Sequence, residues 1–153
     1  MAHIHLTFSP DPAYMRTVRL VVAAVARRAG LGADAVEEIR LATAEACARA
    51  VARHRAHRIS TPIEVSMSDG DRFTVRVTDH GPPEPGIGLR YSKGAGVVVN
   101  DLNDDDIPDD EVTADMSFVL LKGLVADLKI AHGSASAGTE VFMSWPVNRP
   151  VGR

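Results

Sequence analysis

The chain has 153 residues, of which 45% are hydrophobic and 24% are charged, and its net charge is −3. This balance is typical of one ordinary globular domain, so we expect a single domain over residues 1–153. No apolar run approaches the ~20 residues that span a membrane, and the N-terminus lacks the order of a signal peptide. The single cysteine, Cys47, cannot form an internal disulfide. We therefore expect a cytoplasmic protein that does not bind membranes.

The charge is distributed unevenly along the chain. Eight acidic residues and no basic residue lie between 101 and 115, and the rest of the chain is mildly basic. Nucleic-acid binding usually requires a concentrated basic patch, and the sequence contains none. This distribution does not favour a nucleic-acid partner.

The first part of the chain predicts one strand and two helices. Residues 3–8 alternate between polar and apolar side chains, which is typical of a strand. A helix is expected from about residue 12 to 29, ended by Gly30. A second, alanine-rich helix is expected from about residue 35 to 54, with Asp34 as its N-cap.

The middle of the chain predicts a hairpin followed by a long loop. Residues 63–67 and 73–77 alternate with period 2 around Asp69-Gly70, a strong turn signal. Glycine and proline, and then acidic residues, crowd the segment from about 81 to 115. A long loop of this kind inside a compact domain is typical of a lid.

The last part predicts a third helix over 118–125 and a second hairpin, with strands near Leu128–Ile130 and Val141–Trp145. Helices gathered on one face of a sheet give an α+β two-layer sandwich. We expect the sheet to be mixed but mainly antiparallel.

Three motifs occur in this order of elements at characteristic intervals. They are the helical stretch 37–47 with Glu45, the Asp79-His80-Gly81 turn after a strand, and the Gly138-Thr139 step before the last strand. Together they resemble the GHKL (histidine-kinase-like) ATPase fold and, more narrowly, the anti-sigma-factor serine kinases of the RsbW type. The resemblance extends from Leu6 to Pro146.

The resemblance implies an ATP site and a role for each motif. Glu45 matches the catalytic base that polarises the attacking hydroxyl. Asp79 matches the acceptor of the adenine amino group, and Gly81 matches the glycine that lets the base approach. Gly138 and Thr139 match the step that supports the adenine end of the pocket.

The sequence departs from this pattern at the position where the family has a magnesium-binding asparagine, which is Arg49 here. A guanidinium has only donors and a positive charge, so we do not expect a bound metal at this position. Arg49 lies four residues after Glu45, the favoured spacing for an ion pair on a helix. Alternatively, Arg49 contacts the phosphates directly.

Two further departures affect the expected phosphate loop. Pro83 replaces the last glycine of the Asp-x-Gly-x-Gly box, and Asp115 and Ser117 stand where glycines are expected. The glycine clusters at 86–88 and 94–96 lie earlier in the chain at a different spacing. These departures favour a pseudokinase.

The resemblance implies a regulator that binds a sigma factor and a STAS-fold anti-anti-sigma protein, and that can form a homodimer. The alternative is an active ATP-dependent serine kinase that phosphorylates the anti-anti-sigma partner. A nucleotide-sensing scaffold is a third possibility.

Overall fold

The structure is a computed structural model that describes residues 1–82, 89–92, 96–99, 121, 123–132 and 138–148. Its elements follow the order β1 (His3–Phe8), a 3₁₀ turn (Pro12–Tyr14), α1 (Met15–Arg28), α2 (Ala33–Ala56), β2 (Ile63–Asp69), β3 (Arg72–Thr78), β4 (Leu89–Ser92), β5 (Gly96–Val99), β6 (Asp127–His132) and β7 (Thr139–Pro146).

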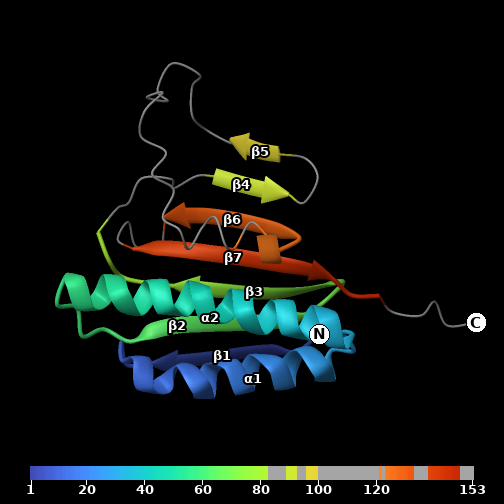
Figure 1. Ribbon diagram of the computed structural model, residues 1–153, viewed down its shortest axis with the longest axis horizontal. Helices are drawn as coiled ribbons and strands as arrows, with labels where there is room; N and C mark the ends of the chain where they lie inside the picture. Colours follow the sequence, from blue (N-terminus) through green and yellow to red (C-terminus); the bar gives the residue numbers. More distant parts are fainter. Residues whose placement is uncertain (83–88, 93–95, 100–120, 122, 133–137, 149–153) are drawn as a thin grey trace, which may run out of the picture.

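The strands form one seven-stranded sheet in the order β1-β2-β3-β7-β6-β4-β5. Each pairing between the described strands is antiparallel. Figure 1 shows both helices on the same side of the sheet, over β1, β2 and β3. The predicted α+β sandwich is confirmed. Among the described residues, none of the helices is both long and apolar enough to cross a membrane.

Alternate residues of the strands face the helices and form the core, as a period of 2 requires. Burial alternates regularly along β2, where Ile63, Val65 and Met67 are buried, and along β3. On α2, small buried side chains allow the helix to approach the sheet closely. One of them is Cys47, and its burial raises the pKa of the thiol to about 12. Cys47 is therefore a packed core residue rather than a reactive thiol.

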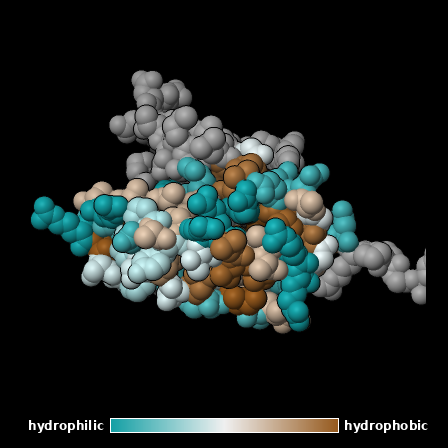
Figure 2. Space-filling model, turned by 60° about the horizontal axis from the view of Figure 1, so that its bottom comes forward, coloured by the Kyte–Doolittle hydropathy of each residue, from teal (hydrophilic) through white to brown (hydrophobic). Residues whose placement is uncertain are grey.

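The outer surface of the layer that contains α1 and α2 is only partly polar. Figure 2 shows hydrophobic residues, in brown, bordered by hydrophilic residues, in teal. The large hydrophobic side chains that remain exposed in this layer are Tyr14, Leu20 and Leu41.

Two predicted segments, the loop 81–115 and the helix 118–125, need correction or lie partly outside the described residues. Two short strands, β4 and β5, lie within the range 81–115 that was expected to be a loop. They form because β4 pairs with β6, a partner distant in sequence that local composition cannot reveal. The rest of that range lies outside the described residues, as does most of the predicted helix 118–125, of which Leu121, Gly123 and Leu124 are helical.

The second helix begins slightly earlier than predicted. Gly32, not Asp34, is the N-cap residue of α2, and no side chain caps this end. Asp34 lies instead in the first turn, where its negative charge complements the helix dipole.

Candidate functional site

The candidate site lies where the end of β3, the start of β7 and the middle of α2 meet. Asp79 directly follows β3, and its backbone N–H donates to the carbonyl oxygen of Thr139 at 3.0 Å. Gly138 has a φ of +93°, and a Cβ on it would lie 1.9 Å from the backbone oxygen of Asp79. The tertiary structure therefore brings the Asp79 motif and the Gly138-Thr139 motif together, although 58 residues lie between Asp79 and Gly138.

Thr139 is fully buried beside this contact. Its hydroxyl oxygen has no hydrogen-bond partner within the part of the chain that the structure describes. A buried hydroxyl without a partner is costly, and such atoms often lie at a binding site.

Asp79 forms a buried ion pair with Arg49 of α2. The Nη1 atom of Arg49 donates to Oδ2 of Asp79 at 3.0 Å, and the two side chains are only 2% and 1% exposed. The expected ion pair between Arg49 and Glu45 is wrong: over the described residues, the structure records none between these two side chains. The physical reason is burial, since a desolvated guanidinium requires a buried counter-ion and Glu45 is partly exposed.

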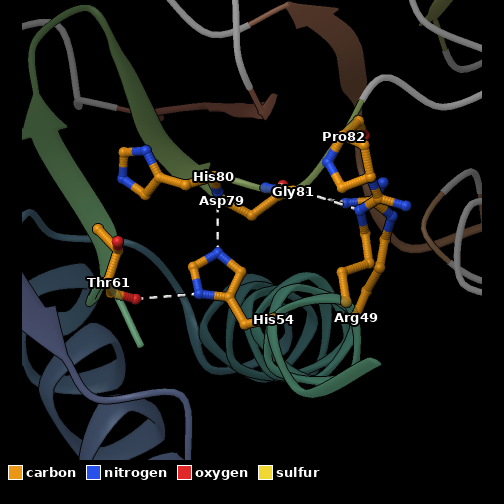
Figure 3. Close-up of polar contacts among 8 residues, drawn as sticks. Arg49, His54, Thr61, Asp79, His80, Gly81 and Pro82 are labelled. Carbon is orange, nitrogen blue, oxygen red and sulfur yellow. Dashed lines mark hydrogen bonds and ion pairs between the residues drawn. The ribbon is translucent and has the colours of Figure 1, made fainter. Parts of the chain in front are cut away.

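The second oxygen of the Asp79 carboxylate also has donors. Oδ1 accepts a hydrogen bond of 2.9 Å from the backbone N–H of Gly81, and Nε of Arg53 lies 3.7 Å away. Arg53 also donates through Nη2 to the backbone oxygen of Pro82. Figure 3 shows Arg49 of α2 next to the turn formed by Asp79, Gly81 and Pro82 after β3.

Arg53 occupies the space beside Gly81. A Cβ added to Gly81 would lie 2.9 Å from Nη2 and 3.1 Å from Nε of Arg53. Arg53 was not among the residues predicted from the sequence to lie at the site. The signal that could have found it is the spacing of Arg49 and Arg53, which places both on one side of α2.

His54, which was not among the predicted site residues, connects the end of α2 to the same turn. The side chain is fully buried. Its Nε2 atom accepts a 2.8 Å hydrogen bond from the backbone N–H of His80, so Nδ1 carries the proton and donates to the carbonyl oxygen of Thr61 at 3.0 Å (Figure 3). The bond that Nε2 accepts requires the neutral ring, because both nitrogens of a protonated ring are donors.

The burial of His54 predicts a loss of stability in mild acid. Desolvation lowers the pKa of His54 from its ordinary 6.5, so the unfolded chain binds a proton more readily than the folded one. The contribution of neutral His54 to the free energy of unfolding is fully present above about pH 6.5. It decreases as the pH falls toward the pKa that His54 has in the folded protein. Urea unfolding at pH 8 and pH 5.5 measures this loss. His54→Gln should show a smaller loss, and His57→Gln, a change at the exposed neighbouring histidine, should match the wild type.

Glu45, the predicted base, lies on α2 one turn before Arg49 and is partly exposed. Pro83, Asp115 and Ser117 lie outside the described residues, as do the glycine cluster at 86–88 and residues 94–95, whereas Gly96 begins β5. Of the residues that the structure describes, no three histidine, cysteine, aspartate or glutamate side chains form a group that could hold a metal.

Comparison with known proteins agrees with this geometry. The histidine kinase-like ATPase domain family matches residues 8–145. Serine-protein kinase RsbW of Bacillus velezensis is 35% identical over 82 residues, which are 52% of this chain and 50% of that protein. Serine-protein kinase RsbW of Bacillus subtilis is 34% identical over 82 residues, with the same coverage. The chain spans about half the length of the curated relatives it matches.

A solved structure supports the fold. The RsbU and RsbW domains of Rv1364c from Mycobacterium tuberculosis match with a TM-score of 0.64 and 20% identity, covering 98% of this chain and 34% of that one. The resemblance expected from the three motifs is thus confirmed: the chain belongs to the histidine kinase-like ATPase domain family and is similar within it to serine-protein kinases of the RsbW type.

Proposed function

We propose that this chain is a cytoplasmic regulator of the anti-sigma type that acts by binding protein partners, with weakened or lost kinase activity. Its partners would be a sigma factor and a STAS-fold anti-anti-sigma protein. The similarity to RsbW proteins supports the regulatory role. The single observation that supports the loss of phosphotransfer is the buried Arg49–Asp79 ion pair.

The guanidinium of Arg49 disfavours a bound metal at this position. The residue occupies the position at which the resemblance expects a magnesium-binding asparagine. A guanidinium offers no lone pair to a metal and repels a divalent cation by its charge. Without a metal, the charge on a transferring phosphoryl group lacks its usual stabilisation.

One observation favours the alternative, an active serine kinase. Glu45 is partly exposed and is not the partner of Arg49 within the described chain, so Arg49 does not neutralise the candidate base. An active enzyme would need another group to stabilise the phosphates.

The test uses the purified chain with sigma factors and STAS-fold proteins from the same organism. We expect saturable binding to at least one of them by calorimetry in the absence of ATP, and light scattering of the same samples reports whether the chain is a homodimer. With γ-labelled ATP and magnesium, we expect no label on the STAS-fold protein.

Label on a serine of that partner, lost in Glu45→Gln, would establish the active kinase instead. Glu38→Gln is the matched control, because Glu38 lies two turns earlier on α2 and is also partly exposed. Failure to bind any of these proteins would contradict the regulatory proposal.

A further inference from the structure

We infer that Arg49 and Arg53 close the adenine end of this pocket from within, so that the chain adopts its folded, partner-binding form without an adenine nucleotide. The family implies ATP at this site, but the residues present do not fit it. The closure of the pocket follows from the family assignment and from the contacts of Arg49 and Arg53. Only the statement that partner binding needs no nucleotide rests on the proposed function.

Both oxygens of the Asp79 carboxylate, to which the adenine amino group would donate, already accept hydrogen bonds. Oδ2 already accepts from Arg49 at 3.0 Å, and Oδ1 already accepts from the amide of Gly81 at 2.9 Å. The bond from Arg49 joins two opposite charges in a buried place, whereas an adenine amino group would bring no charge to the carboxylate. An adenine that displaced Arg49 would also separate a buried cation from its counter-ion, which is strongly unfavourable.

The space beside Gly81 is occupied by the side chain of Arg53. The resemblance assigns Gly81 the role of leaving room for the base. Here the guanidinium of Arg53 lies so close that even a Cβ on Gly81 would be 2.9 Å from Nη2. A planar ring cannot enter this space unless Arg53 moves away and gives up its hydrogen bond to the Pro82 carbonyl.

The turn after β3 is also fixed by side chains of α2. Three contacts from α2 hold the turn after β3: Arg49 to Asp79, Arg53 to Pro82, and His54 to the amide of His80. They cross-link the helix and the sheet at the place where a nucleotide would otherwise do so. Regulation of this chain would then be independent of the ATP to ADP ratio.

The experiment is a titration of the ¹⁵N-labelled chain with ADP, followed by NMR. The amide resonances of Asp79 and Gly81 are the reporters, because both N–H groups donate within the closed turn. We expect no saturable shift in the wild type at millimolar ADP. Arg49→Asn should show saturable shifts, with at least a tenfold gain in affinity. Arg55→Asn, a change at an exposed arginine of the same helix, should behave as the wild type.

Saturable shifts in the wild type that disappear in Asp79→Asn would overturn the inference. A folded Arg49→Asn protein that gives no shifts would also overturn it, because Arg49 would then not be the group that excludes the base. Arg49→Gln is the second variant if Arg49→Asn does not fold: it removes the positive charge, so it should also show saturable shifts, and their absence in a folded protein would overturn the inference. Partner binding is measured separately, so the failure of this inference and of the proposed function are distinguishable.

Discussion

Replacing Arg49 by methionine is expected to lower the free energy of unfolding by about 3 kcal/mol, measured by urea denaturation at pH 7.5. The substitution keeps the apolar stem of the side chain but leaves the Asp79 carboxylate, which is 1% exposed, without its closest cation. Breaking a buried ion pair typically costs ~3–5 kcal/mol. We expect the lower end of that range because Nε of Arg53 remains 3.7 Å from the carboxylate.

A double-mutant cycle tests whether the loss comes from the pair. The cycle uses Arg49→Met, Asp79→Asn and their combination, and we expect a coupling energy of about 2 kcal/mol. Arg55→Met is the matched control, and its exposed position predicts a change within about 0.5 kcal/mol. A loss below about 1 kcal/mol in Arg49→Met would show that the buried pair does not hold this end of the pocket.

Gly138→Ala is expected to destabilise the fold by at least about 3 kcal/mol. Two costs combine at this position. The φ of +93° strains any residue with a Cβ, and that Cβ would lie 1.9 Å from the carbonyl oxygen of Asp79. The strands β3 and β7 would have to separate at the point where Asp79 donates to Thr139.

Gly30→Ala separates these two costs. Gly30, after α1, has a φ of +89°, and a Cβ added to it would have no heavy atom within 4 Å beyond its own chain neighbours. This variant should therefore lose only the strain, about 1–2 kcal/mol. Equal losses in the two variants would show that the contact with Asp79 does not constrain Gly138.

These two predictions concern motif residues that make structural contacts within the chain. Asp79 pairs with Arg49, the amide of Gly81 donates to Asp79, and Gly138 lies against the carbonyl oxygen of Asp79. Under the further inference, Arg49 takes the place at Asp79 that the resemblance assigns to the adenine amino group.

The sequence by itself determined the local elements and the family. The period-2 strands at 3–8, 63–69 and 72–78 and the alanine-rich helix follow from patterns that act over a few residues, so they could be predicted. The three motifs were also sufficient for the family, because their residue types and intervals do not depend on which side-chain partners form.

Only the tertiary structure decided which groups meet. The strands β4 and β5 depend on pairing with β6, a segment distant in sequence. The partner of Arg49 is Asp79, 30 residues away, rather than Glu45 on the same helix. Helical spacing shows which side chains lie near each other along α2, but burial decides which charges must pair. Burial arises only when the helix packs on the sheet. A guanidinium that this packing removes from water then requires the buried carboxylate within its reach.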